Sequence, residues 1–160
     1  MSLVKVSIYI PAFNAEKTIL SCINSILNAT LNFLEALRFT GCKARYFNAA
    51  SSECFGNIKN GFANENTIFS PKSPYGVSKS SAYWLVSSYR ESYGIYAASG
   101  ILFNHESPRR GETFVTRKIT MFFAKYLNGI KDVLKLGNIY AKRDWGHAKD
   151  YVEMQWKILQ

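Results

Sequence analysis

One feature restricts the fold of this chain more than any other. It is a predicted strand followed by a helix that carries a tyrosine and a lysine. Residues 45–50 are expected to form a strand, and residues 75–93 have the apolar spacing of a helix that stops at Gly94. Ser51 and Glu53 then fall just past the carboxyl end of the strand, where open α/β sheets bind their ligands. The order therefore predicts an α/β fold with a functional site at this end of the sheet.

Tyr75 and Lys79 are four residues apart and share one face of the predicted helix. An ammonium group near a phenol favours the ionised phenolate, so Tyr75 is a candidate base. The Ser51 hydroxyl could bridge Tyr75 to a substrate alcohol, and Glu53 could handle a second proton. Taken alone, a Tyr-x-x-x-Lys pair is also typical of solvated helix surfaces, and both interpretations stay open at this point.

The remaining pattern alternates between strands and helices. We expect strands at 4–10, 95–103 and 133–136, a helix that starts near Ile19 and continues up to Gly41, a helix at 114–127, and loops at 56–74 and 104–113. The helix at 75–93 should bury the side chains of Ala82, Leu85, Val86 and Tyr89. This alternation favours a parallel sheet with flanking helices.

Composition limits the functional classes. The chain has 160 residues, 48% of them hydrophobic, and a formal net charge of +9, which suit one globular domain with an anionic partner. No nucleic-acid-binding motif accompanies the basic residues, so nucleotide phosphates explain them better. Three cysteines without metal-ligand spacing indicate neither a zinc site nor a disulfide framework. No membrane span or signal peptide is apparent, and we expect a cytoplasmic protein.

Several segments together resemble one enzyme family. Residues 73–79 are similar to the active-site helix of the extended short-chain dehydrogenase/reductases. A longer set of segments resembles the GDP-mannose 4,6-dehydratases within that group: 90–94, 100–118, 136–138, 143–148 and 150–152. This resemblance runs from about Leu31 to Gln160 and implies a partial Rossmann-like fold, NADP as cofactor and GDP-mannose as substrate.

The resemblance also implies roles for individual residues. Tyr75 would take the proton of the sugar C4 hydroxyl, Lys79 would tune Tyr75 and contact the nicotinamide ribose, and Glu53 would act at C5 and C6. Ser51 stands where the family usually has Thr. The positions that match cofactor contacts are Tyr75, Lys79, His105 and Arg110, and those that match substrate contacts are Asn104, Val115, Lys118 and Arg143.

The start of the chain resembles a different family. Residues 1–27 are similar to the beginning of a family 2 glycosyltransferase, so we expect a strand-helix segment there and a partial dehydratase domain at 28–160. The Gly-x-x-Gly-x-x-Gly turn of the dehydratases is absent, since the first glycine is Gly41. We therefore expect impaired dehydratase activity. The alternatives are a non-catalytic sugar-nucleotide-binding module and an inactive truncated fusion product, and the family relationship implies a possible homo-oligomer.

Overall fold

The computed structural model describes residues 19–58 and 61–160. The strand expected at 4–10 lies outside the described residues. The chain divides into two compact units, residues 1–99 and 100–160. Helix α1 (Ile19–Thr40) continues through residues 27 and 28, and the different ancestry of the segments before and after this point stays a prediction.

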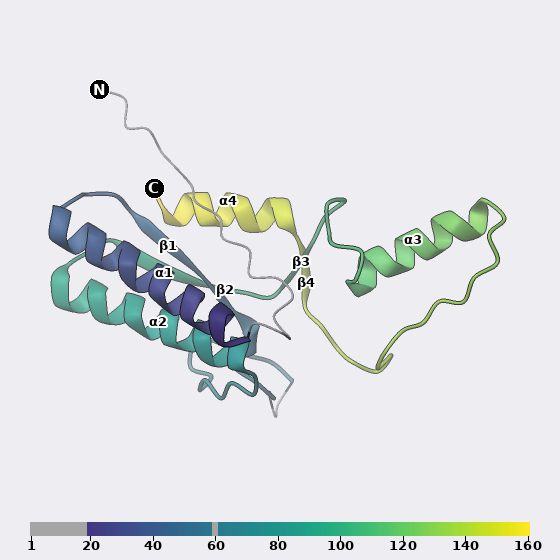
Figure 1. Cartoon of the computed structure of the whole chain (residues 1–160), viewed down its shortest axis with the longest axis horizontal. Coiled ribbons are helices and arrows are strands. Elements are labelled where there is room, and N and C mark those ends of the chain that lie inside the picture. Colours follow the sequence, from purple (N-terminus) through teal and green to yellow (C-terminus); the bar gives the residue numbers. More distant parts are fainter. Residues whose placement is uncertain (1–18, 59–60) are drawn as a thin grey trace, which may run out of the picture. The chain divides into compact units, whose positions relative to one another are not determined.

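The first unit is built around one strand-helix-strand arrangement. Strand β1 (Tyr46–Ser51) leads into a short 3-10 turn, η1 (Ser52–Cys54), and then to α2 (Pro74–Tyr93) and β2 (Ala97–Leu102). β1 and β2 pair in a two-stranded sheet, and α2 packs against β1 and against α1 (Figure 1). This arrangement confirms the predicted α/β class with parallel pairing and flanking helices.

The core of this unit lies between the two helices and the sheet. Leu34 of α1, Val86 of α2 and Ala97 of β2 form its buried centre. Tyr46, Leu85, Tyr89 and Ile95 pack around this centre. The predicted inner face of the helix is therefore confirmed, with Ala82 and Val86 fully buried. Burial of these apolar groups stabilises the unit and fixes the rotation of α2 against the sheet.

Both ends of α2 are set by local chemistry. The Ser73 side chain accepts a hydrogen bond of 3.0 Å from the backbone N–H of Gly76, and Pro74 occupies the first helical position. Gly94 ends the helix in the left-handed conformation, at φ 64°, which glycine adopts without steric cost. The helix therefore begins one residue before the predicted start and stops at the predicted glycine.

The second unit contains two short strands and two helices. Strand β3 (Asn104–Glu106) pairs in parallel with β4 (Trp145–His147), with His105 opposite Gly146. The helices are α3 (Val115–Leu127), as predicted, and α4 (Ala148–Ile158). None of the described helices is long and apolar enough to cross a membrane.

Two sequence-based expectations for this unit need correction. The predicted loop at 104–113 begins with β3, because Asn104 to Glu106 find a pairing partner 41 residues later in β4. The predicted strand at 133–136 is wrong, since these residues have no strand pairing and Val133 is 73% exposed. Strand β4 and helix α4 were not predicted. A short apolar run forms a strand only where a partner satisfies its backbone groups.

Candidate active site

The end of β1 positions the first two candidate catalytic residues. Ser51 is the last residue of β1, and Glu53 follows in η1 with an exposed side chain. The Ser51 hydroxyl oxygen accepts a hydrogen bond of 3.3 Å from the backbone N–H of Glu53 and so caps the turn. Because this contact uses only an acceptor site of the hydroxyl, the Ser51 O–H can still donate to a substrate.

Tyr75 and Lys79 lie in the first part of α2, on one face of the helix as predicted. The Lys79 Nζ is 5.7 Å from the centroid of the Tyr75 ring. The same nitrogen donates a hydrogen bond of 2.9 Å to the carbonyl oxygen of Ala49 in β1. The Tyr75 side chain is 37% exposed and therefore accessible to a small molecule. The lysine is fixed between the strand and the tyrosine ring.

Gly76 allows helix α2 and the η1 turn to approach each other closely. A Cβ atom at Gly76 would lie 2.7 Å from the carbonyl oxygen of Glu53, too close for any side chain without movement. Helix α2 and the η1 turn are therefore in direct backbone contact at this point. The structure thus brings the four predicted catalytic residues into one corner of the first unit, at the carboxyl end of β1.

The loop at 56–74 packs against η1 and α2, at the same end of β1. The backbone N–H of Ser70 donates to the carbonyl oxygen of Cys54 at 2.9 Å, and the Phe69 ring packs edge-on against Phe55 and Tyr83. Gly56 has φ 61°, and its Cα lies so close to Ser70 that no side chain would fit. These contacts hold the loop against η1 and α2.

The other predicted contact residues belong to the second unit, and β3 carries two of them. The Asn104 side-chain amide donates to the carbonyl oxygen of Asp144 at 3.2 Å. The His105 Nδ1–H donates to the carbonyl oxygen of Phe103 at 3.0 Å, which leaves Nε2 as an acceptor. The His105 ring lies 5.3 Å from the Tyr151 ring, and burial together with the Asp144 charge raises the pKa of Tyr151.

The remaining predicted residues of this unit lie in the segment after β3 and in the loop before β4. The Arg110 guanidinium carbon is 3.5 Å from the centroid of the Phe114 ring. Val115 is the first residue of α3, and Lys118 lies one turn later with an exposed side chain. Arg143 is exposed and donates to the neighbouring carbonyl oxygen of Lys142 at 2.8 Å.

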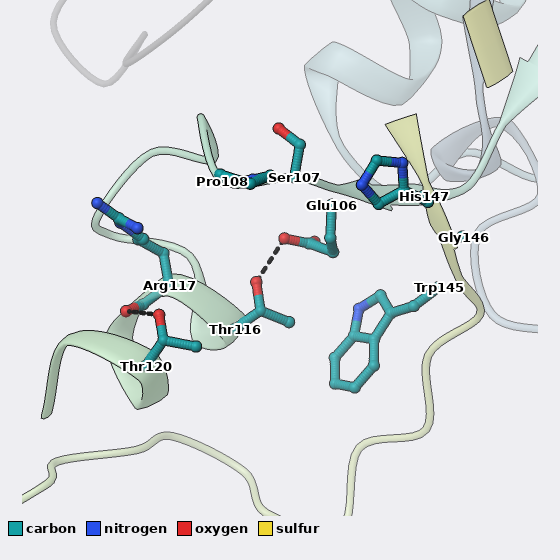
Figure 2. Close-up of a pocket in the computed structure, with 9 residues that line it drawn as sticks. All are labelled: Glu106, Ser107, Pro108, Thr116, Arg117, Thr120, Trp145, Gly146 and His147. Atoms are coloured by element: carbon teal, nitrogen blue, oxygen red, sulfur yellow. Dashed lines mark hydrogen bonds between the residues drawn. The ribbon is translucent and has the colours of Figure 1, made fainter. Parts of the chain in front are cut away.

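A pocket of about 600 Å³ opens in the second unit beside these residues (Figure 2). Its lining comes from β3 and the segment after it, from α3, and from β4: Glu106, Ser107, Pro108, Thr116, Arg117, Thr120, Trp145, Gly146 and His147. Within the pocket, the Thr116 hydroxyl donates a hydrogen bond to the Glu106 carboxylate (Figure 2).

Sequence reasoning assigned no site role to the pocket residues. One sequence signal could have identified Glu106 as a site residue. Side chains alternate along a strand, so Glu106 lies on the same face of β3 as Asn104. Trp145 and His147 belong to β4, which was not predicted. Within the described residues, no group of three or more His, Cys, Asp or Glu side chains could hold a metal ion.

The family relationship is decided by sequence comparison. The profile of the family described as GDP-mannose 4,6 dehydratase matches residues 1–160. The chain belongs to the GDP-mannose 4,6-dehydratase family. Its curated relatives include the GDP-mannose 4,6-dehydratase of Vibrio cholerae serotype O1, which is 57% identical over 133 residues. The GDP-mannose 4,6 dehydratase 2 of Caenorhabditis elegans is 48% identical over 157 residues, or 98% of this chain.

The family members are considerably longer than this chain. It covers 36% of the Vibrio protein and 40% of the Caenorhabditis protein. Among solved structures, RMD from Pseudomonas aeruginosa complexed with NADPH superimposes with a TM-score of 0.83 at 25% identity. That match covers 91% of this chain and 51% of the Pseudomonas chain. The shared fold therefore extends over about half of the Pseudomonas chain.

Proposed function

We propose that this chain carries the Tyr-Lys active-site portion of a GDP-mannose 4,6-dehydratase, a lyase that converts GDP-mannose to GDP-4-keto-6-deoxymannose with NADP. The observation that carries the proposal is the placement of Lys79 between Ala49 and the Tyr75 ring, beside the turn that holds Glu53. The family relationship and the names of the relatives support the substrate assignment.

The donor set around Tyr75 fits a nicotinamide cofactor. The Lys79 ammonium, held by the Ala49 carbonyl oxygen, is a donor of the kind that binds ribose hydroxyls. The exposed Tyr75 phenol is a further donor and acceptor on the same face. Bound NADP would supply the hydride acceptor for oxidation at C4 and would return the hydride at C6. The NADPH complex of the structurally similar Pseudomonas protein supports this choice.

The chain's own residues then perform the proton transfers. Tyr75 as phenolate removes the proton from the C4 hydroxyl, and the Lys79 ammonium stabilises that phenolate. Ser51 donates its hydrogen bond to the same substrate oxygen or to the phenolate. Glu53 removes the C5 proton and passes it to the departing C6 hydroxyl, which leaves as water. When the hydride returns to C6, C5 takes up one proton, which balances the proton that Tyr75 removed from the C4 hydroxyl, so the net change is the loss of one water.

The second unit would supply the binding residues. We assign cofactor contacts to His105 and Arg110, in addition to Tyr75 and Lys79, and substrate contacts to Asn104, Val115, Lys118 and Arg143. The exposed Lys118 ammonium and Arg143 guanidinium suit a diphosphate, because both are cations with several N–H groups that can donate to phosphate oxygens. We also propose that the protein is cytoplasmic and that it forms a homo-oligomer.

One sequence observation favours a second candidate function. Residues 1–40 contain no glycine, so this stretch cannot form the Gly-rich turn on which the family places the cofactor pyrophosphate. We expect impaired turnover as a result. A chain that binds GDP through the second unit but does not bind NADP would be a sugar-nucleotide-binding module without catalysis.

The test is conversion of GDP-mannose by the purified chain with NADP, followed by mass spectrometry for the loss of one water. We expect slow conversion that Glu53→Gln and Tyr75→Phe abolish. Glu65→Gln, which changes an exposed loop carboxylate, serves as the matched control and should leave the rate unchanged. Conversion that survives in the Tyr75→Phe variant would contradict the proposed role of this tyrosine. GDP binding without NADP binding would favour the binding module.

A further inference from the structure

The carboxylate of Glu106 connects three parts of the second unit. Glu106 is the last residue of β3 and pairs with His147 of β4 in the strand register. Its Oε2 accepts the hydrogen bond from the Thr116 hydroxyl in the first turn of α3. The same oxygen lies 3.3 Å from Arg110 Nε. The Arg110 contact lacks hydrogen-bond alignment and is therefore an ion pair.

This ion pair is largely removed from solvent. The Arg110 and Glu106 side chains are 21% and 19% exposed, and the guanidinium of Arg110 also lies over the Phe114 ring. A shielded ion pair is screened less by salt than a surface pair, and loss of one partner leaves the other without compensation. Glu106 therefore determines where the Arg110 side chain lies.

Helix α3 has no side-chain cap of its own. Phe114 occupies the N-cap position and makes no side-chain hydrogen bond to the helix. The first turn of a helix exposes N–H groups and carries a partial positive charge, which a nearby carboxylate stabilises. Through Thr116, the Glu106 carboxylate fixes the turn that begins with Val115 and leads to Lys118 (Figure 2).

We propose that Glu106 is a positioning residue that holds Arg110 in the geometry needed for cofactor binding and the first turn of α3 in the geometry needed for sugar-nucleotide binding. The inference rests on the proposed function, because Arg110, Val115 and Lys118 matter only if they contact cofactor or substrate. Glu106 acts through these neighbours and needs no contact with the ligand itself.

The test measures GDP binding by calorimetry in the full chain. Glu106→Gln keeps the size of the side chain but removes its charge, and we expect it to weaken GDP binding about tenfold. Thr116→Val, which removes only the hydroxyl donor, should weaken binding by a smaller factor. Glu112→Gln, an exposed carboxylate in the same segment, is the matched control and should bind within about twofold of the original chain.

A double-variant cycle with Lys118→Ala separates positioning from general loss of stability. If Glu106 acts by placing Lys118, the double variant should bind GDP little more weakly than Lys118→Ala alone. Unfolding curves for each variant establish that the compared proteins are folded. Unchanged binding in Glu106→Gln, or fully multiplicative effects in the double variant, would overturn the inference. If the original chain does not bind GDP, the proposed function fails, and the inference fails with it.

Discussion

Lys79 Nζ donates a hydrogen bond of 2.9 Å to the carbonyl oxygen of Ala49, which lies 30 residues earlier in the chain. This bond joins helix α2 to strand β1 two residues before Ser51, where the sheet ends. It satisfies a backbone acceptor and fixes an otherwise flexible ammonium group below the Tyr75 ring. The position of the lysine therefore depends on how α2 packs against the sheet.

The Ser73 cap should stabilise the turn that carries Tyr75. Ser73→Ala removes the acceptor for the Gly76 N–H, and we expect the free energy of unfolding to fall by about 1 kcal/mol. Urea unfolding followed by circular dichroism measures this change. Ser73→Asp keeps a cap acceptor and should retain most of the stability. An equal loss in both variants would show that the cap is unimportant.

The contact between Gly76 and Glu53 should not tolerate a side chain. In Gly76→Ala the new methyl group would lie 2.7 Å from the Glu53 carbonyl oxygen, so α2 or η1 must shift. We expect a loss of about 1–3 kcal/mol in unfolding free energy and weaker cofactor binding. Gly137→Ala is the matched control, because a Cβ there meets nothing within 4 Å and the backbone needs no positive φ. Equal stability of the two variants would contradict the close approach.

Leu34 should contribute more to stability than any exposed leucine of the chain. Its side chain is fully buried against α2 and β2, and Leu34→Ala should lower the unfolding free energy by about 2–5 kcal/mol. Thermal unfolding provides the measurement. Leu127→Ala changes a side chain that is 83% exposed, and its midpoint should stay close to that of the original chain. Similar losses in both variants would place the core elsewhere.

Glu35 should make the stability of the first unit depend on pH in the acid range. The Arg38 guanidinium, with an Nη2–Oε2 distance of 2.6 Å, and then the Tyr89 hydroxyl lower the pKa of Glu35 below its usual value of 4.5. A lowered folded-state pKa means that the stabilisation is present above pH 4.5 and is lost as pH falls through the folded-state pKa. Urea unfolding at a series of pH values measures this loss.

A matched substitution isolates the contribution of Glu35. Glu35→Gln should flatten the dependence of unfolding free energy on pH below about 4.5, because the side chain no longer titrates. Glu65→Gln changes an exposed loop carboxylate and should leave the slope as it was. An unchanged slope in Glu35→Gln would mean that the contacts with Arg38 and Tyr89 do not stabilise the charged carboxylate.

Elements with strong local signals were predicted correctly from the sequence. Helix α2 has an apolar face, a capping serine before Pro74 and a terminating glycine, so local and tertiary preferences agree. The position of Ser51 and Glu53 at the carboxyl end of β1 followed from the predicted strand, and their role in a site there stays a prediction. For Tyr75 and Lys79, helical spacing alone predicted that the two side chains share a face.

Elements that depend on distant pairing were predicted poorly. Strands β3 and β4 have three residues each, and each exists because the other supplies its hydrogen-bond partners. Val133 to Leu136 have higher strand propensity than either of these strands but no strand pairing, so they remain irregular. The contacts of Glu106 were not predicted for the same reason, since Thr116 and Arg110 become its neighbours only when the segment after β3 folds back.

The most direct test of the account is NADP binding to the purified chain by calorimetry, compared with a Tyr75→Phe, Lys79→Ala double variant. We predict measurable binding to the original chain and none to the double variant, because the cofactor ribose should contact both altered side chains. The double variant must show a cooperative unfolding transition to be a valid comparison. No binding to the folded original chain, or equal binding to both proteins, would contradict the proposal that Tyr75 and Lys79 form a cofactor site.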